Sequence, residues 1–284
     1  MNSESPTTKE QTNPFENKTT SSSYSKADPI YQKSAEAIVE FQDPLEFGAD
    51  SVLVDLGAGT GVSSEVLVKK GAKNLTVVDP SKAMLAEAEA RLEDEVEYLC
   101  SDAEQFYANF EANVDIVYAL NCIHLFPDMV KALAGIACAL KKGGLFVFNI
   151  SAPTYSFETI DTEEKALIQA NLDFYKNLSE VVENPILAHT VELLKRTIDG
   201  DKELLYTKER FVEIFKSVNF EFIDSREIVI EVEADYQKNI WRMIAQSFIQ
   251  DMEQIETLIK SVELRGMIKL RQAQFKFANQ NTLV

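Results

Sequence analysis

Short apolar runs alternate with amphipathic stretches over residues 30–155. The runs lack the strict alternation of a half-buried strand, so we expect both of their faces to be covered. The stretches between them repeat apolar residues at helical spacing. This order predicts a doubly wound α/β domain with a mostly parallel sheet. The expected strands are SVLVDLG (51–57), NLTVVD (74–79), VEYLCSD (96–102), VDIVYALN (114–121) and GLFVFNIS (144–151).

Helices are expected before and between these strands. One covers 29–41 and precedes the first strand. Gly71 and the pair Gly143 and Gly144 stand where helices should end, because glycine readily takes the left-handed conformation of a helix C-terminus. The other helices expected in this region cover 62–71, 81–94, 103–110 and 127–143.

The pattern changes after Ser151. Two helical stretches separated by Pro185 fill 162–198 and predict a helical insertion. A helix over 206–219 and two strands, FEFIDS (220–225) and REIVIEVEA (226–234), come next. The connection between these strands is too short for a parallel crossover, so we expect an antiparallel hairpin at one sheet edge. Residues 235–275 are expected to be helical; five large apolar side chains would lie near one helix face, Trp241, Ile244, Phe248, Met252 and Ile255.

Four parts follow from these patterns. Residues 1–23 are rich in Ser, Thr, Asn and Glu, and we expect them to be disordered because so few apolar groups cannot offset the entropy of ordering. The α/β core is expected over 24–155 and 203–234. A helical insertion at 156–202 interrupts it, and a C-terminal helical segment at 235–284 follows it.

Composition narrows the classes of function. The 284 residues are 45% hydrophobic, enough for a sizeable core, and their formal charge is −18. A surface with this much negative charge repels phosphate backbones. We therefore expect no nucleic-acid substrate. Two histidines and three cysteines without CxxC spacing predict no metal site and reduced thiols. No apolar run approaches the ~20 residues of a membrane span, and the N-terminus lacks a signal-peptide core, so we expect a soluble, cytoplasmic protein.

Three glycines at alternate positions follow the first strand in VLVDLGAGTG (52–61): Gly57, Gly59 and Gly61. A glycine turn between a buried strand and a helix lets a ligand approach the backbone and meet free helix N–H groups. In an open α/β sheet such a turn lies at the carboxyl ends of the strands, where ligands bind. Asp79 ends the next strand, where a carboxylate can accept hydrogen bonds from ribose hydroxyls. Dinucleotides and S-adenosylmethionine both fit this arrangement.

Two residues favour S-adenosylmethionine. Val62 stands where the third glycine of a dinucleotide motif would be. Asp55, two residues before Gly57, would oppose a pyrophosphate but suits a cationic group; alternatively, it caps backbone N–H groups at the strand end. S-adenosylmethionine carries a sulfonium and an amino group and no phosphate. An NAD-type dehydrogenase is therefore disfavoured.

Four motifs in order resemble those of class I S-adenosylmethionine-dependent methyltransferases, in the group of small-molecule enzymes that includes quinone-biosynthesis methyltransferases. The resemblance covers about 30–155 and 205–234 and implies a Rossmann-like methyltransferase fold with an antiparallel last strand. The motifs are VLVDLGAGTG, TVVDPSKAML, YLCSDAEQF, and VDIVYALNCIHLFPD together with LKKGGLFVFNIS.

The resemblance implies a set of cofactor contacts. Asp102 and Ala103 would border the adenine, although Asp102 could also cap the helix expected after it. Asn121 would face the methionine portion through its backbone. Tyr24 and Tyr31 belong to a segment that often covers the cofactor in this family, where aromatic faces favour a sulfonium; alternatively, they pack on the helix surface. The predicted cofactor-binding residues are Asp55, Gly57, Ala58, Gly59, Gly61, Asp79, Pro80, Met84, Asp102, Ala103, Asn121, Tyr24 and Tyr31.

Both histidines are candidate catalytic residues. His124 follows Asn121 by three residues, and an ordinary pKa of ~6.5 suits a general base; alternatively, the ring packs and shapes the pocket floor. In this family an insertion after the fifth strand usually forms a lid over the acceptor pocket. His189 lies in that insertion and could reach down from it, or lie on its surface. The apolar side chains of the insertion favour an acceptor with substantial apolar surface.

These patterns predict methyl transfer to a small, largely apolar organic acceptor, first of all O-methylation of a natural-product or lipid-like compound. The alternatives are C-methylation, a carrier-bound substrate, or a non-catalytic scaffold that binds the cofactor. NCIH stands after the fourth strand in place of the NPPY-like tetrapeptide of nucleobase-methylating enzymes, which argues against DNA. The last twenty residues carry four basic side chains and no acidic one: Arg265, Lys269, Arg271 and Lys276. They could dock an acidic carrier protein, or complement an acidic face of the same chain or of a second copy in a homodimer.

Overall fold

A computed structural model describes residues 28–42, 48, 50–93, 96–152, 154–201 and 205–281. The tail predicted to be disordered at 1–23, and Tyr24, lie outside the described residues. None of the described helices is both long and apolar enough to cross a lipid bilayer.

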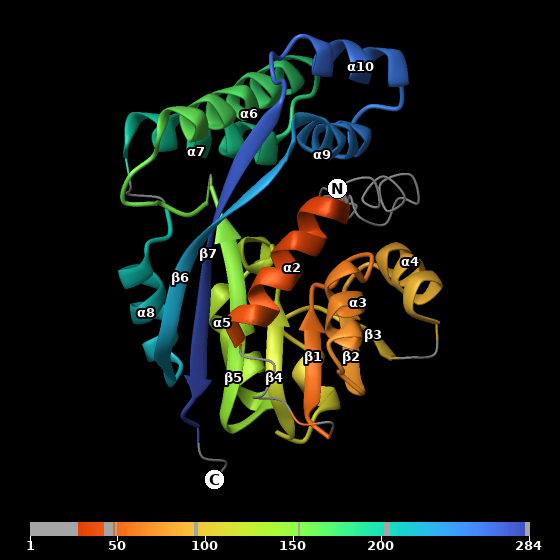
Figure 1. The fold of residues 1–284 in the computed structure, drawn as a ribbon, viewed down its shortest axis with the longest axis vertical. Helices are drawn as coiled ribbons and strands as arrows, with labels where there is room; N and C mark the ends of the chain where they lie inside the picture. Colours follow the sequence, from red (N-terminus) through yellow and green to blue (C-terminus); the bar gives the residue numbers. More distant parts are fainter. Residues whose placement is uncertain are drawn as a thin grey trace, which may run out of the picture.

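A seven-stranded sheet in the order β3-β2-β1-β4-β5-β7-β6 forms the centre of the described structure (Figure 1). Strands β1 to β5 pair in parallel, and β7 runs antiparallel between β5 and β6. The predicted mostly parallel sheet with an antiparallel last strand is therefore confirmed. The strands are β1 (Val52–Leu56), β2 (Asn74–Asp79), β3 (Glu97–Cys100), β4 (Val114–Ala119), β5 (Leu140–Ser151), β6 (Phe220–Glu233) and β7 (Met267–Asn279).

Strand β1 pairs with both β2 and β4 in parallel, so the chain order reverses at this strand. Such a reversal leaves a crevice beyond the carboxyl ends of the strands, because the connections on its two sides depart in opposite directions. The fold therefore places the ends of β1, β2 and β4 around one potential ligand site.

The helices expected around the core are present as α2 (Asp28–Gln42), α3 (Val62–Lys69), α4 (Lys82–Leu92), α5 (Met129–Ala139) and α8 (Lys208–Ser217). The helix expected over 103–110 is wrong: this segment forms only the short 3₁₀ turn η4 (Phe106–Asn109). Helix α5 lies directly against it. A Cβ added to Gly135 of α5 would lie 3.2 Å from the carbonyl oxygen of Ala103, so the segment follows the surface of α5 in place of forming its own helix.

Four helices form a cap above the carboxyl ends of the strands (Figure 1). They are α6 (Thr162–Val181) and α7 (Pro185–Asp199) from the insertion, and α9 (Ala234–Gln246) and α10 (Met252–Lys260) from the C-terminal region. Trp241 of α9 is fully buried and stacks on Phe174 of α6, with ring centroids 5.1 Å apart. Its Nε1 also donates to Asn171 Oδ1 at 2.8 Å. The insertion and the C-terminal helices therefore form one layer.

The expected hairpin between FEFIDS and REIVIEVEA is wrong. Both segments belong to the single strand β6, which pairs along its length with β7. Strand β7 occupies 267–279, a region expected to be helical, so the helical segment predicted at 235–284 ends before it and the core extends to include it. Partners distant in the sequence decide this outcome, because strand propensity depends on packing against neighbouring strands.

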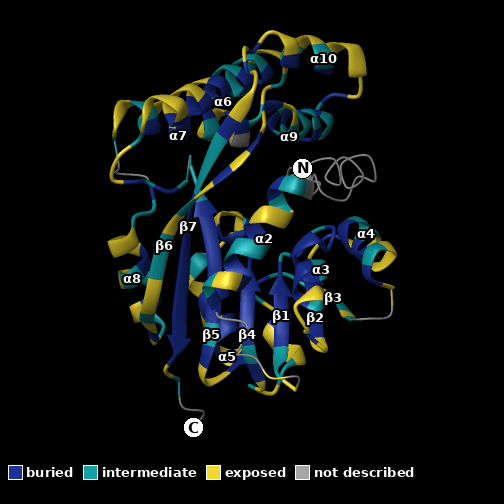
Figure 2. Ribbon diagram, in the orientation of Figure 1, coloured by how far each residue is buried: buried dark blue, intermediate teal, exposed yellow. Residues whose placement is uncertain are grey.

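Aromatic side chains fill the core between β5, β7 and α8, and both strands are largely buried (Figure 2). Phe148 of β5 is fully buried, and its ring lies 5.1 Å from that of Phe275 and 5.4 Å from that of Phe215. Offset or tilted aromatic pairs at such distances add to the free energy gained from burial. These contacts fix β7 in the sheet.

Truncation of Phe148 should therefore be costly. We expect Phe148→Ala to lower the free energy of unfolding by about 3–5 kcal/mol, because the variant loses apolar burial and leaves a cavity among rings that cannot all move into it. Chemical denaturation followed by far-ultraviolet circular dichroism measures the change. Leu125→Ala, at a side chain that is 54% exposed, is the control and should lower it by less than about 1 kcal/mol. Equal losses would contradict this description of the core.

Candidate functional site

The turn between β1 and α3 carries three glycines in the left-handed region, Gly57, Gly59 and Gly61, with φ of 71°, 57° and 81°. The backbone N–H groups of Gly57 and Ala58 donate to the carbonyl oxygen of Val78, at 2.8 and 3.1 Å, and bind the turn to β2. A Cβ added to Gly57 would lie 2.7 Å from Cys122 Sγ, whereas one added to Gly59 would meet no atom within 4 Å. One side of the turn is thus held against the sheet, and the Gly59 side is open.

Asp79 at the end of β2 lies directly against this turn. Its Oδ2 accepts from the backbone N–H of Gly59 at 2.9 Å, and its Oδ1 accepts from that of Ser81 at 2.8 Å. Ser81 caps α4, because its Oγ accepts from the N–H of Met84 at 3.2 Å. Of the two other residues predicted from this motif, Met84 is buried and Pro80 is exposed.

Asp55 at the end of β1 is fully buried beneath the turn. Its Oδ2 accepts from the hydroxyls of Ser63 and Ser64 at 2.5 and 2.6 Å, so it does not act mainly as a cap for backbone N–H groups. Its Oδ1 has no hydrogen-bond partner. Burial, offset in part by the two hydroxyls and reinforced by the charge of Asp79, raises the pKa of Asp55 to about 6. A buried carboxylate with an unpartnered oxygen suits a cationic group.

The end of β3 completes one side of the site. The N–H of Ser101 donates to the carbonyl oxygen of Asp79 at 3.2 Å, which holds the next residue, Asp102, close to β2. Asp102 Oδ1 accepts from the N–H of Glu104 at 2.9 Å. Asp102 therefore caps a local turn, as its alternative interpretation proposed, although no α-helix follows. Ala103 is buried beside it.

The loop after β4 completes the other side. Asn121 has a positive φ of 53°, and its N–H donates to Asn149 Oδ1 of β5 at 2.7 Å. Cys122 donates through its Sγ to the carbonyl oxygen of Leu56, at 3.1 Å, and so binds the loop to the glycine turn. The sequence predicted Asn121 but missed Asn149 and its partner Gln272. The signal for Asn149 is a polar residue within the otherwise apolar run GLFVFNIS, whereas Gln272 lies among other polar residues of β7 and carries no such signal.

His124 lies on the 3₁₀ turn η5 (Ile123–Leu125) that follows Asn121. Its side chain is solvent-accessible, yet desolvation by the surrounding protein lowers its pKa to about 4. None of the described residues forms a hydrogen bond with it. The imidazole is therefore neutral at pH 7, but its lowered pKa makes it a weaker base than the ordinary value on which the sequence prediction rested.

The other predicted side chains lie farther out. His189 is exposed on α7 of the cap, and Tyr31 is half-buried on α2. No interaction recorded for His189 joins it to the glycine turn, so the structure does not bring the two candidate bases together. Within the described part of the chain, no group of three or more His, Cys, Asp or Glu is arranged to hold a metal ion.

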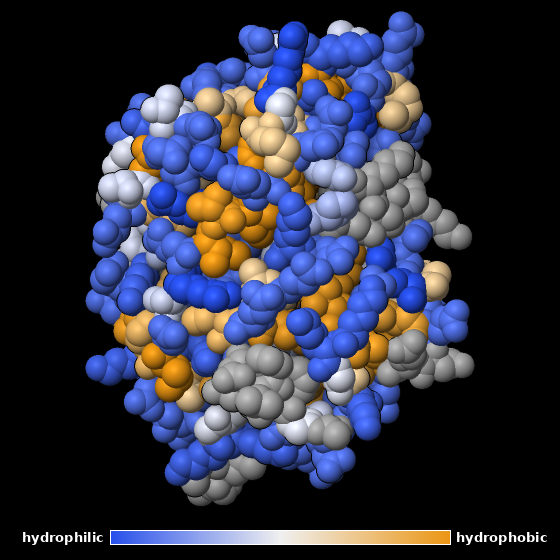
Figure 3. Space-filling view, in the orientation of Figure 1, coloured by the Kyte–Doolittle hydropathy of each residue, from blue (hydrophilic) through white to orange (hydrophobic). Residues whose placement is uncertain are grey.

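The cap meets the core through apolar side chains. Ile168 and Leu172 of α6 and Leu194 of α7 form a buried cluster that contacts Ala152 at the end of β5. Tyr175 of α6 packs against the same cluster, and burial raises its pKa to about 12. Figure 3 shows apolar groups gathered on this face near the junction of cap and core, within a mostly hydrophilic surface. The region above β5 is therefore apolar, in contrast to the acidic glycine turn.

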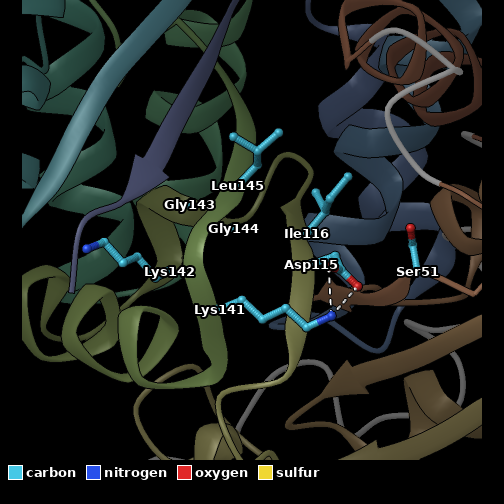
Figure 4. A pocket seen from close by; sticks show the side chains of 8 residues that line it. All are labelled: Ser51, Asp115, Ile116, Lys141, Lys142, Gly143, Gly144 and Leu145. Carbon is cyan, nitrogen blue, oxygen red and sulfur yellow. Dashed lines mark hydrogen bonds and ion pairs between the residues drawn. The ribbon is translucent and has the colours of Figure 1, made fainter. Parts of the chain in front are cut away.

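A hollow of about 210 Å³ lies elsewhere, at the amino ends of the strands. Figure 4 shows it beside Ser51, which precedes β1, and beside the glycine pair Gly143 and Gly144. Lys141 and Asp115 already form an ion pair there at 2.9 Å. This hollow is at the opposite end of the sheet from the glycine turn, and the acidic and apolar regions described above do not contribute to it.

Comparison with known proteins agrees with the geometry. Residues 54–148 match the family model for a methyltransferase domain. A ubiquinone biosynthesis O-methyltransferase of Methylobacterium is 34% identical over 110 residues, which cover 37% of this chain and 43% of that protein. A malonyl-[acyl-carrier protein] O-methyltransferase of Xylella fastidiosa is 25% identical over 155 residues, covering 54% of this chain and 52% of that protein. The chain spans about a third to about half of the length of the first curated relatives it matches.

A solved structure shares the fold. It is phosphoethanolamine N-methyltransferase 2 of Haemonchus contortus in complex with phosphomonomethylethanolamine and S-adenosylhomocysteine, which is 18% identical. The TM-score is 0.52, and the match covers 88% of this chain and 53% of that one. At this sequence identity the structural similarity supports the fold and gives no information about the substrate.

The raised pKa of Asp55 predicts a pH-dependent stability. Its folded-state pKa of about 6 lies above the ordinary value of 3.8, so folding favours the protonated form and the wild type loses stability as the pH rises through 4 to 6. The neutral isostere Asp55→Asn avoids this loss. Relative to that variant, we expect the wild type to lose about 3 kcal/mol in free energy of unfolding between pH 4 and pH 7, measured by urea denaturation.

Ser63→Ala supplies a matched comparison. It removes one hydroxyl that lowers the pKa of Asp55, so the loss should move to higher pH. A difference between wild type and Asp55→Asn that does not change with pH would show that the pKa of Asp55 is the same in the folded and unfolded protein, which would contradict the raised value.

Proposed function

We propose that this chain, whose α/β core is a class I S-adenosylmethionine-dependent methyltransferase domain, transfers the methyl group of S-adenosylmethionine to a small, largely apolar organic acceptor. The observation that carries the proposal is the pairing of the open glycine turn with Asp55, a buried carboxylate that has an unpartnered oxygen. An acidic, phosphate-excluding turn fits a cofactor that carries cationic groups. When bound, that cofactor supplies an electrophilic methyl group on a sulfonium.

The predicted residues are proposed to contact different parts of the cofactor. Asp79, at the end of β2, is proposed to accept hydrogen bonds from the ribose hydroxyls, and Asp102 and Ala103 to border the adenine. The turn from Gly57 to Gly61 would lie along the methionine portion, with Asp55 behind it. Ala58, Pro80 and Met84 would shape the edges of the site. Tyr31 of α2 would cover it, as would Tyr24 beyond the described residues.

The acceptor is proposed to bind between the cap and the end of β5. The apolar cluster around Leu172 and Leu194 would hold an aliphatic or aromatic body by burial of apolar surface. Such a pocket excludes water, and much of the rate enhancement of a methyl transfer can come from holding the nucleophile in line in a dry site. The high pKa of Tyr175 keeps its phenol neutral, so this side chain can donate a hydrogen bond to a polar group of the acceptor.

Oxygen methylation is the reaction we favour. A hydroxyl acceptor must lose its proton, and His124 on the loop after β4 is proposed to take it; its imidazole is neutral at pH 7, although its lowered pKa makes it a weaker base than an ordinary histidine. The similarity to ubiquinone biosynthesis O-methyltransferases supports the same choice. Methylation of a stabilised carbanion would need little help from His124 and is the second candidate. His189 of the cap is the alternative base, although its exposed position gives it less support.

A carrier-bound substrate is a further candidate, because one relative is named as acting on malonyl-[acyl-carrier protein]. The basic residues near the C-terminus support it less than the sequence suggested. Lys269 pairs with Glu163 and Arg271 with Glu164, both at 2.8 Å, and Lys276 is buried over the ring of Phe41. These side chains therefore complement acidic and aromatic groups of the same chain, which was the alternative interpretation.

The first test is calorimetric titration with S-adenosylmethionine, S-adenosylhomocysteine and NAD. Micromolar binding of the first two and none of NAD would support the proposal, and a labelled-methyl screen of apolar hydroxyl compounds would follow. If the protein binds S-adenosylmethionine but neither transfers its methyl group nor slowly hydrolyses it in any assay, the non-catalytic scaffold is favoured. Binding of NAD alone would overturn the cofactor assignment.

Loss of the Asp79 carboxylate should weaken cofactor binding. We expect Asp79→Ala to reduce the affinity for S-adenosylhomocysteine by about 1–3 kcal/mol, the value of hydrogen bonds to a charged group together with the lost support of Gly59. Calorimetry measures the affinity, and thermal unfolding checks that the variant is folded. Asp224→Ala on the distant strand β6 is the control and should bind as the wild type does. Unchanged affinity in Asp79→Ala would remove this residue from the site.

His124→Ala separates chemistry from binding. With a hydroxyl acceptor we expect turnover to fall by about 10²–10⁴-fold, the range for loss of a general base, while the affinity for S-adenosylhomocysteine stays unchanged. The matched variant His189→Ala in the cap should have little effect on turnover. If His124→Ala keeps full turnover and His189→Ala does not, the roles of the two residues are reversed.

A further inference from the structure

We infer that Asn121 is a binding residue whose side-chain Nδ2 donates to the carboxylate of the cofactor's methionine portion, and that Asn149 and Gln272 are positioning residues that aim this donor. The inference rests on the proposed function; it gives the side chain of Asn121 a role beyond the backbone contact that the resemblance implies, and it adds Asn149 and Gln272. It starts from a closed group of three side-chain amides: Asn121 after β4, Asn149 near the end of β5, and Gln272 within β7.

One backbone donor fixes the orientation of all three amides. The N–H of Asn121 can only donate, and it meets Asn149 Oδ1 at 2.7 Å. The other atom of that amide is therefore Asn149 Nδ2, which donates to Asn121 Oδ1 at 3.1 Å and to Gln272 Oε1 at 2.9 Å. Gln272 must then present its Nε2, which donates to Asn121 Oδ1 at 3.1 Å and to Ser34 Oγ of α2 at 2.8 Å.

The three supporting residues are rigidly placed. Asn149 and Ser34 are fully buried, and Gln272 is 3% exposed. Every amide hydrogen and oxygen of Asn149 and Gln272 that faces the group has a partner within it. Reversal of any one amide would place two acceptors or two donors against each other at a buried site, so the arrangement has one orientation.

Asn121 is left with a free donor. Both lone pairs of its Oδ1 are used by the amides of Asn149 and Gln272. No described residue accepts a hydrogen bond from its Nδ2. That atom is also not among the described side-chain polar atoms that are buried without a hydrogen-bond partner. The side chain is half-buried. It therefore presents two N–H groups, and no acceptor, to the open side of the loop.

The position of this donor identifies its ligand. Cys122, the next residue, contacts Gly57 and donates to the carbonyl oxygen of Leu56, so Asn121 lies at the β4 side of the glycine turn. Asp79 lies at the opposite side, on β2. A ligand whose ribose lies at Asp79 would extend its amino-acid end toward Asn121.

The charges around the glycine turn indicate that Asn121 would bind the carboxylate of the cofactor's amino-acid end. The amino-acid end of the cofactor is a zwitterion, and Asp55 beneath the turn favours its ammonium group. The carboxylate would lie near Asp55 and Asp79 in a strongly acidic protein, so it requires a donor to offset their repulsion. The fixed amide of Asn121 supplies that donor without adding a positive charge that would repel the sulfonium.

The test measures binding to purified full-length variants by calorimetry, with S-adenosylhomocysteine and 5′-methylthioadenosine as probes. The second probe lacks the amino-acid end. Asn121→Gly removes the donor and tolerates the positive φ, and we expect about tenfold weaker binding of S-adenosylhomocysteine. Asn121→Asp is isosteric, also tolerates this backbone conformation, and places a carboxylate against the carboxylate; it should bind more weakly still. Neither variant should change the affinity for 5′-methylthioadenosine.

Gln272→Glu tests the positioning role. It places an oxygen against Asn121 Oδ1 in place of the donor Nε2, so the Asn121 side chain should be displaced from the orientation that aims its Nδ2 outward. We expect weaker binding of S-adenosylhomocysteine with unchanged binding of 5′-methylthioadenosine, and recovery in Gln272→Met, which does not repel Asn121 Oδ1. Asn177→Asp on the cap, an amide-to-carboxylate change at a distant site, is the control and should bind both probes as the wild type does.

The outcomes separate this inference from the proposed function. A wild type that binds neither probe contradicts the cofactor assignment itself. A wild type that binds both, with Asn121→Asp binding S-adenosylhomocysteine equally well, overturns the inference alone. Equal loss of both probes in the Asn121 variants also overturns it, because the amide would then act on the shape of the site and not on the amino-acid end. Because the Asn121 variants change an accessible side chain, the test does not depend on the folding of Gln272→Glu.

Discussion

The antiparallel placement of β7 between β5 and β6 is the constraint on which the rest of the structure depends. In its register with β5, Phe275 lies opposite Phe148 and Gln272 lies opposite Ser151. The aromatic residues build the core, and Gln272 reaches the amide group at the ends of β4 and β5. One strand thus joins the packing that stabilises the domain to the residues proposed to bind the ligand.

The same strand holds the cap. Arg271 pairs with Glu164 at the start of α6 at 2.8 Å and donates to the carbonyl oxygen of Thr159 at 2.7 Å. Glu164 is only 8% exposed and also completes the capping box with Asp161. An isolated exposed ion pair contributes little to stability, but this one is largely shielded and joins an element of the sheet to the first turn of the insertion. The basic residues that distinguish the C-terminal sequence therefore position the cap.

The contrast between an acidic cofactor region and an apolar acceptor region gives the site its chemistry. Asp55 lies beneath the glycine turn and Asp79 lies against it, where they oppose phosphate and favour cationic groups. The cap and the end of β5 present aliphatic side chains instead. The loop after β4 carries Asn121 and His124, the residues proposed as hydrogen-bond donor and base.

The sequence by itself determined the parallel core, the glycine turn and the acids at the ends of β1, β2 and β3, because each depends on a local pattern of apolar residues, glycines and strand-end carboxylates. Tertiary structure decided the rest. Strands β6 and β7 pair across two intervening helices, the segment around Phe106 follows the surface of α5, and Asn149 and Gln272 meet only when β5 and β7 are neighbours. Hydrogen bonds between residues this distant in the chain leave no periodic trace in either segment, so only the folded chain shows that these amide groups meet.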